Sequence, residues 1–396
     1  MATKKQKLKE LSWQTVGVDG WLAFAFVCLL VVGTVMVASS SVAVAEKNTG
    51  DAFYYLKRHI LFIGVGLMLS YMVMHIPSQW MDRLSRPMLI LAVVALILVL
   101  VPGIGVTVNG AQRWLNLGVS RFQVVEAVKL ALIAALASYV VHHFKSIQQS
   151  MLGVLKPLLG VAFMAFLLLL QPDFGSAALL LIITFVMIYI AGARYRDVGV
   201  LGLLASTGMA VIAWAEPYRV KRLTNFQDPW QDPFGDGFQL VQALIAVGRG
   251  EFGGVGIGAS IQKLFYLPEA HTDFIFAVYA EEMGFVGVLL LVCLFLLLVF
   301  RMFKVSKEAF ENGNDFGGFL CTGVAVWIAL QAVLSMGVNL GILPTKGLTL
   351  PFISSGGSAI MMNIIAMAVV FRVSFENKRM HFHSNATSPQ KSEVKA

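Results

Sequence analysis

Residues 275–300 read IFAVYAEEMGFVGVLLLVCLFLLLVF, an almost unbroken apolar stretch with two glutamates near its start. A helix of about 20 apolar residues crosses the hydrocarbon core of a bilayer, so this stretch is long enough for one transmembrane helix. Similar runs recur along the whole chain. They lie near residues 21–45, 59–76, 87–105, 124–142, 152–170, 175–192, 198–215, 317–342 and 356–373. The sequence therefore predicts an all-α polytopic membrane protein with ten transmembrane helices.

The composition agrees with this prediction. Of the 396 residues, 58% are hydrophobic and 13% are charged, and the mean hydropathy is +0.77. Soluble domains are roughly 45–50% apolar and about 25% charged. All three cysteines fall inside apolar runs, which favours small buried side chains over disulfides or metal ligands.

The basic residues predict the orientation, because Lys and Arg favour the cytoplasmic side of short loops. With the lysine-rich N-terminus inside, roughly 18 of the 30 Lys and Arg fall on that face and about 11 on the other. Ten spans then place both termini in the cytoplasm. This bias and anionic lipid headgroups explain the net charge of +8, so the charge does not indicate nucleic acid binding. We expect a cytoplasmic segment (1–20), a transmembrane domain (21–375) and a disordered cytoplasmic tail (376–396).

One external loop, residues 216–274, is long and rich in Gly, Pro and aromatic residues, as functional loops are. Its stretch GFQLVQALIAVG (237–248) predicts an amphipathic surface helix within an ordered lid. Its apolar face would hold Phe238, Val241, Leu244 and Ile245, with Gln239 and Gln242 beside it. The alternative is a helix that only packs the loop down. The glycine-rich stretch 248–260 lacks the lysine of a Walker motif and its strand-to-helix context, which argues against a nucleotide loop. The alternative is an external backbone whose N–H groups approach a ligand.

Ionisable residues crowd the outer entrance of the span 275–300. They are Glu269, His271 and Asp273, with Thr272 between them, and Glu281 and Glu282 within the span. Burial at this boundary would tune the proton affinity of Asp273, so it is a candidate general base. We place Glu269 one helical turn before it.

The fourth span carries a second polar group. Gln123, Glu126 and Lys129 recur at three-residue spacing and would share one helix face. A lysine inside a membrane needs an acid. Glu126 is the local candidate, and Asp273, Glu281 or Glu282 are the tertiary ones. The alternative is that such pairs only lock helices together.

Three further external segments add polar residues at the same level. These are NGAQRWLNLG (109–118) with Arg113 and Trp114, QPDFGS (171–176) with Asp173, and PTKGLTLPFISSGGS (344–358) with Lys346, Ser354, Gly356, Gly357 and Ser358. Together they predict an outer pocket in which Arg113, Lys263 and Lys346 hold a phosphate-bearing group. The alternatives are an interface anchor for Arg113 and Trp114, a helix cap for Asp173 and a close-packing turn for SSGGS.

These motifs, with HTDFIFAVYAEEMGF (271–285), resemble the SEDS (shape, elongation, division and sporulation) family over roughly residues 15–375, and its cell-division branch most. The resemblance implies a peptidoglycan glycosyltransferase that polymerises lipid II at the outer face of the bacterial cytoplasmic membrane, at the division septum. It also implies a class B penicillin-binding protein and other membrane proteins of the division machinery as partners. Two motifs depart from the family pattern: QVVE (123–126) lacks a proline, and ISSGGS (353–358) lacks a tyrosine.

By motif match, the family's essential acid falls on Asp273 and its fourth-span lysine on Lys129. Asp273 would deprotonate the acceptor hydroxyl, and a polyprenyl diphosphate would leave with inversion at the anomeric carbon. Gln239 and Gln242 would turn toward sugar hydroxyls. No cofactor is required by the sequence, although a divalent cation, Mg²⁺ or Mn²⁺, would assist departure of the diphosphate.

Two other functions remain open from the sequence alone. A transporter that flips lipid-linked precursors would also use ten helices and intramembrane charges, but it should expose comparable polar machinery on both sides. The patterned loops are nearly all external, which favours chemistry outside. A silent scaffold for division proteins would not need a specific acid at Asp273.

Overall fold

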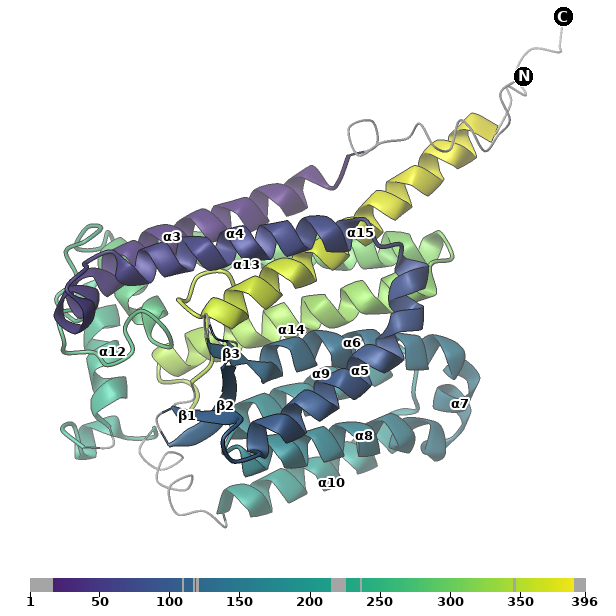
Figure 1. Cartoon of the computed structure of the whole chain (residues 1–396), viewed down its shortest axis with the longest axis horizontal. Helices are drawn as coiled ribbons and strands as arrows, with labels where there is room; N and C mark the ends of the chain where they lie inside the picture. Colours follow the sequence, from purple (N-terminus) through teal and green to yellow (C-terminus); the bar gives the residue numbers. More distant parts are fainter. Residues whose placement is uncertain are drawn as a thin grey trace, which may run out of the picture.

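A computed structural model describes residues 17–108, 110–116, 118, 121–214, 226–235, 237–344 and 347–387, with side chains to residue 380. Long helices lie side by side in a bundle (Figure 1). Within the described residues, nine helices are long and apolar enough to cross a membrane, which confirms the predicted all-α polytopic class. They are α3 (Gly20–Thr49), α4 (Tyr54–Met74), α5 (Ser78–Leu100), α6 (Val124–His142), α8 (Met151–Leu170), α10 (Tyr195–Trp214), α13 (Ile275–Glu311), α14 (Asp315–Asn339) and α15 (Gly357–Thr387).

The remaining predicted span, residues 175–192, corresponds to α9 (Phe174–Ile190), which has 17 residues. At 1.5 Å per residue it is about 25 Å long, a little short of the roughly 30 Å hydrocarbon core. α3 begins and α15 ends at the same end of the bundle (Figure 1), where the Asp19 amide donates to Ser374 Oγ at 3.2 Å. A shared end requires an even number of crossings, which favours counting α9 as a span; the number ten stays a prediction.

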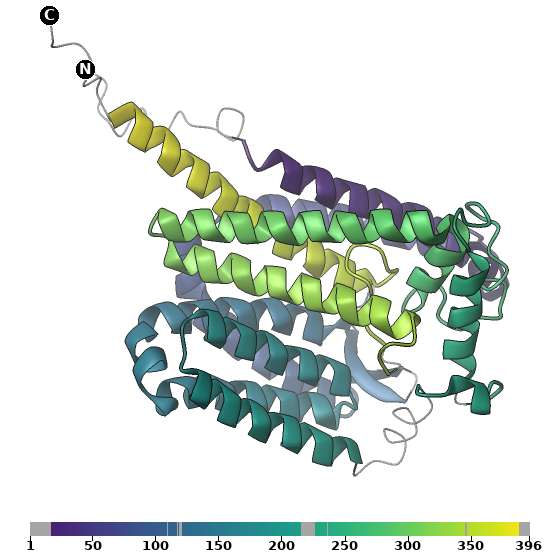
Figure 2. The ribbon, with the colours of Figure 1, turned by 180° about the vertical axis from the view of Figure 1, so that it is seen from behind.

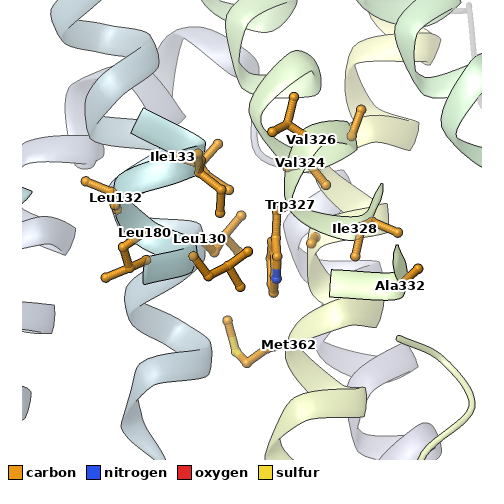
Figure 3. Close-up of a cluster of buried hydrophobic side chains, with 14 of the residues drawn as sticks. Leu130, Leu132, Ile133, Leu180, Val324, Val326, Trp327, Ile328, Ala332 and Met362 are labelled. Carbon is orange, nitrogen blue, oxygen red and sulfur yellow. The ribbon is translucent and has the colours of Figure 1, made fainter. Parts of the chain in front are cut away.

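The centre of the bundle is formed by α6, α14 and α15, which are far more buried than α4 and α10. Helices that are apolar all round are expected in such central positions. Figure 3 shows Trp327 of α14 among Leu130 and Ile133 of α6, Leu180 of α9 and Met362 of α15. This packed layer supports the polar residues of α6 and α14.

A small sheet, which the apolar pattern did not predict, covers one end of the bundle. It consists of β1 (Gly105–Val108), β2 (Ala111–Asn116) and β3 (Arg121–Gln123), paired antiparallel in the order β1-β2-β3. The apolar run expected to reach residue 105 ends as helix at Leu100. The signal was present, because an Asn-Gly pair at 109–110 between alternating residues is typical of a hairpin.

The described part of the long external loop contains a 3₁₀ turn, η1 (Pro229–Gln231), and the predicted helix, α12 (Phe238–Arg249). α12 stands at the sheet-bearing end of the bundle (Figure 2). Of its predicted apolar face, Val241 is buried and Phe238 and Leu244 are half-buried, whereas Ile245 is 37% exposed. The other buried residues of α12 are Leu240, Ala243 and Ala246. Small alanines let α12 lie close to α13, where Gly250 abuts the Ala280 carbonyl.

The structure describes only part of the two predicted terminal segments. Residues 1–16, and with them most of the predicted cytoplasmic segment, lie outside the described residues. α15 continues as helix to Thr387, beyond the domain boundary that we expected at residue 375. A short helix, α7 (Phe144–Gln149), joins α6 to α8.

Candidate active site

A cavity of about 1010 Å³ lies beside the small sheet. Binding sites for small molecules typically measure roughly 300–1,000 Å³. Its walls come from β2, the α8–α9 turn, the start of α12 and the segments that precede α13 and α15. The predicted site residues that line it are Arg113, Trp114, Gln123, Asp173, Gln239, Glu269, Thr272, Asp273, Gly356 and Ser358. Residues far apart in the sequence thus meet in one polar chamber.

Asp273 lies half-buried in the cavity wall, two residues before the first residue of α13. Its backbone is fixed by Asn339, whose Nδ2 donates to the Asp273 carbonyl at 3.0 Å and whose Oδ1 accepts from the Ala277 amide at 3.1 Å. A methyl group on Gly347 would lie 2.7 Å from Asp273 Oδ2, so glycine leaves room for the carboxylate.

The segment before α13 is tied to the segment before α15. Ser354 Oγ donates to the Thr272 carbonyl at 2.7 Å, and the Ser355 amide donates to the His271 carbonyl at 3.0 Å. Ser354 is buried and is absent from the cavity lining, so its contact is with protein backbone. Thr272 Oγ1 donates to Glu269 Oε2 at 2.6 Å. Glu269 adopts a φ of 56° in a series of turns, so its expected place one helical turn before Asp273 is wrong.

His271 turns away from the cavity. Its ring packs against Tyr55 of α4, with 4.7 Å between ring centroids. Burial lowers the pKa of His271 below its ordinary value of 6.5, and the nearby Glu269 raises it by a smaller amount. The neutral imidazole is therefore favoured, and His271 supports the wall from behind.

Lys129 is almost completely buried beneath the cavity. Its Nζ lies 2.8 Å from Glu126 Oε2, without the alignment of a hydrogen bond, and donates to Gln331 Oε1 at 2.8 Å. Gln331 also accepts from Trp327 Nε1 and donates to the Thr349 carbonyl at 2.9 Å. Thr349 lines the cavity, so a chain of polar contacts runs from Lys129 to the cavity wall. Of the four predicted acids, the partner of Lys129 is Glu126.

Arg113 brings positive charge to the cavity. Its Nε donates to the Gln171 carbonyl at 3.1 Å, its Nη2 donates to the Pro172 carbonyl, and Nη1 lies 4.0 Å from Asp173 Oδ1. Its side chain remains 27% exposed, so part of the guanidinium faces the cavity. Asp173 caps α9 by accepting from the Ser176 amide, as the capping alternative predicted.

The two motifs that depart from the family pattern, QVVE (123–126) and ISSGGS (353–358), contact each other in the structure. The Gln123 amide donates to Ser358 Oγ at 3.1 Å, and both residues line the cavity. Gly357 does not line it, because it packs against Phe62.

Several predicted binding residues lie away from the cavity. Lys263 and Glu281 are buried in ion pairs, Lys263 Nζ with Glu282 Oε1 at 2.6 Å and Glu281 Oε1 with Arg249 Nη1 at 2.9 Å. A buried lysine that is already paired does not face a phosphate in this structure, so the positions of Lys263 and Glu281 do not support their predicted roles in binding. Gln242 is absent from the lining of the cavity. Lys346 lies outside the described residues.

Three residues that were not predicted from the sequence complete the site. Asn339 fixes the backbone of Asp273, Gln331 connects Lys129 to the wall, and Gly347 makes room for the carboxylate. Asn339 and Gln331 are polar residues within an apolar span, a pattern that indicates function. That pattern is visible in the sequence, although it does not show which partners the two side chains bind.

Of the cavity carboxylates, Glu269 and Asp273 belong to the segment before α13, and Asp173 belongs to the α8–α9 turn. Among the described residues, no three His, Cys, Asp or Glu side chains come close enough together to hold a metal ion. Asp173 caps a helix and Glu269 accepts from Thr272. These carboxylates form no preassembled metal cluster, and we derive no step through a metal.

Comparisons with known proteins agree with the motifs. Residues 20–379 match the family described as "Cell cycle protein", which groups FtsW, RodA and SpoVE. The "Probable peptidoglycan glycosyltransferase FtsW" of Xanthomonas oryzae pv. oryzae is 48% identical over 372 residues, which cover 94% of this chain and 76% of that protein. The protein of the same description from Coxiella burnetii is 43% identical over 374 residues, which cover 94% of this chain and all of that protein.

Two solved structures share the fold. A chain of the structure "Structural coordination of polymerization and crosslinking by a peptidoglycan synthase complex" has a TM-score of 0.71 and 32% identity, over 90% of this chain and 98% of its own. The rod shape determining protein RodA of Thermus thermophilus has a TM-score of 0.66 and 28% identity, over 90% of this chain and 97% of its own.

Proposed function

The chain belongs to the FtsW, RodA and SpoVE family of cell cycle proteins, and we propose that it is a peptidoglycan glycosyltransferase that polymerises lipid II during cell division. The family expected from the motifs is thereby confirmed. The observation that carries the catalytic proposal is the meeting of Asp273 and Arg113 in one cavity.

In this proposal Asp273 is the general base. It takes the proton of the acceptor hydroxyl while that oxygen bonds to the anomeric carbon of the donor. The bond from that carbon to the diphosphate breaks, and the polyprenyl diphosphate leaves with its electron pair. Attack opposite the leaving group inverts the α-linked donor to a β-linked product. A single base suffices, because the diphosphate needs positive charge more than a proton.

Arg113 is the described cavity residue best suited to the departing diphosphate. Its guanidinium is oriented by the carbonyls of Gln171 and Pro172, and part of it faces the cavity. A charge already held in place stabilises a developing negative charge without reorganisation in the transition state. Lys129 and Glu126 form a buried pair that supports the cavity wall at Thr349 through Gln331.

The setting follows from the relatives. We propose a multi-pass protein of the bacterial cytoplasmic membrane, with both termini inside, that acts at the septum beside a class B penicillin-binding protein and other division proteins. The similar chain from a peptidoglycan synthase complex that couples polymerization and crosslinking supports a crosslinking partner.

The proposal is tested with purified protein in vesicles that contain lipid II, with and without the penicillin-binding protein. We expect glycan from the wild type and none from Asp273→Ala, with unchanged insertion and thermal stability, because Asp273 lies half-buried at a cavity wall. Asp51→Asn changes an exposed carboxylate before α4 and serves as the control. Near wild-type glycan from Asp273→Ala would refute the base. Transfer of lipid II across the vesicle membrane without glycan would instead favour the transporter.

A further inference from the structure

α13 is not a continuous helix. At Gly284 the backbone takes φ 62° and ψ −167°, which interrupts the helical hydrogen bonds. Polar backbone groups within a span must find partners in the protein. The loop after α12 supplies them through four hydrogen bonds: Val255 to the Glu281 carbonyl (3.0 Å), Gly256 to the Glu282 carbonyl (3.0 Å), Phe285 to the Glu251 carbonyl (2.8 Å) and Val286 to the Phe252 carbonyl (3.2 Å). The loop 251–256 is therefore inserted into the break.

Glycines allow this insertion. A Cβ on Gly250 would overlap the Ala280 carbonyl, and a Cβ on Gly254 would overlap the Glu282 carbonyl. On the other side of the contact, a Cβ on Gly284 would overlap the Gly254 amide nitrogen. This contact accounts for two glycines of the stretch 248–260, Gly250 and Gly254, which let two backbones approach each other.

Side chains reinforce the same contact. Glu281 and Glu282 are 0% and 1% exposed, and each is held by its own cation from the loop. Glu281 accepts from Arg249 and from Ser260 Oγ. Glu282 accepts from Lys263 Nζ at 2.6 Å and from Ser39 Oγ of α3 at 2.7 Å. Buried carboxylates of this kind persist only when paired, so the loop and the helix break depend on each other.

The first part of α13, residues 275–283, is thus a short rigid helix of about 13 Å, fixed at both ends. Asn339 fixes its N-terminus, next to Asp273, and the loop fixes its C-terminus. We propose that the loop segment 249–263 positions Asp273 for catalysis by setting the place of this short helix. The proposal rests on the proposed glycosyltransferase function, in which Asp273 is the base. Arg249, Gly254 and Lys263 are then positioning residues that act without touching substrate.

The distinguishing experiment compares a glycine of the loop with one outside it. Gly254→Ala forces the loop away from the Glu282 carbonyl, whereas Gly313→Ala, after the C-terminus of α13, adds a methyl group where no atom lies within 4 Å. Both residues have positive φ, 77° and 73°, so both substitutions place alanine in a similarly strained backbone. Because a shift of about 1 Å in a catalytic group can cost on the order of 100-fold, we expect Gly254→Ala to lower kcat by about tenfold or more. KM for lipid II should stay within about twofold, and Gly313→Ala should keep the kcat of the wild type.

Amide hydrogen exchange gives a readout that does not depend on activity. Residues 275–283 should exchange faster in Gly254→Ala than in Gly313→Ala, because the carbonyl partners of the loop are displaced. Equal kcat and equal exchange in the two variants would overturn the proposal, as would a loss confined to KM. If Gly254→Ala does not insert, Glu282→Gln repeats the test with the side-chain volume kept and the ion pair removed. A wild type without glycan synthesis would defeat the proposed function, whereas the exchange comparison would still decide how the short helix is held.

Discussion

Asn339, the last residue of α14, holds Asp273 by its backbone rather than by its carboxylate. Its side chain is fully buried, donates to the Asp273 carbonyl at 3.0 Å and accepts from the Ala277 amide at 3.1 Å. The unpaired first turn of a helix commonly finds such a partner. Here the partner comes from another helix, so the position of α14 determines where the candidate base lies.

We predict that Asn339→Ala lowers kcat for glycan synthesis and also destabilises the protein. Loss of the amide leaves buried backbone groups unpaired, at a cost of about 1–3 kcal/mol. Asn339→Asp is the matched variant, because it keeps the acceptor for Ala277 and loses the donor to Asp273. Thermal unfolding and polymerisation assays on both variants check this. An Asn339→Ala protein with wild-type stability and kcat would contradict it.

The effect of replacing Lys129 should depend on Glu126 and not on Glu281 or Glu282 of α13. Removing one partner of a buried ion pair costs about 3–5 kcal/mol, because the other charge remains buried alone. We therefore expect Lys129→Met to impair folding or activity strongly, and the additional change Glu126→Gln to restore part of the loss. Glu282→Gln, whose partners are Lys263 and Ser39, should add its effect independently. Full activity of Lys129→Met would remove the lysine from the site, and coupling to Glu282 would contradict the observed pairing.

His271 should make stability fall in mildly acidic solution. Its pKa in the folded protein lies below 6.5, so the unfolded chain binds the proton first as the pH falls. Stability is then fully retained above about pH 6.5 and decreases as the pH drops toward the folded pKa. The melting temperature of the wild type should decrease between about pH 7.5 and about pH 5.5 more than that of His271→Gln, which does not titrate in this range. Equal decreases would show that other groups dominate.

The sequence predicted the elements that depend on local pattern and missed those that depend on tertiary contact. Apolar length predicted the spans, and three-residue spacing predicted the contact of Glu126 with Lys129. The pairing of Lys263 with Glu282 was not predicted, because the two residues are 19 positions apart in the chain and meet where the loop lies against the break at Gly284. The apolar pattern does not reveal such a break. The residues on both sides of Gly284 are helical, and most of the residues that follow it are apolar.

The site residues show the same difference between local pattern and tertiary contact. Asp273 and Arg113 were recognised from motifs and external position, and both line the cavity. Asn339 and Gln331 were passed over because they stand singly in an apolar run. Their roles follow from the partners that folding brings to them, the Asp273 carbonyl and Lys129 Nζ.

The two glutamines of α12 offer a test within one helix. Gln239 lines the cavity, whereas Gln242, three residues later, does not. The sequence pattern assigned both to sugar hydroxyls; the structure separates them. We predict that Gln239→Ala raises KM for lipid II severalfold, in line with the loss of one or two hydrogen bonds of about 0.5–1.5 kcal/mol each.

Gln242→Ala serves as the matched control, because it removes the same chemical group from the same helix. Its KM should remain at the wild-type value, and expression and melting temperature should be unchanged in both variants. Initial rates over a range of lipid II concentrations measure the difference. If both variants behave like the wild type, Gln239 only packs the helix down. If both raise KM equally, substrate contacts extend along α12 beyond the cavity, and the lid must close further over the bound headgroup than it does in this structure.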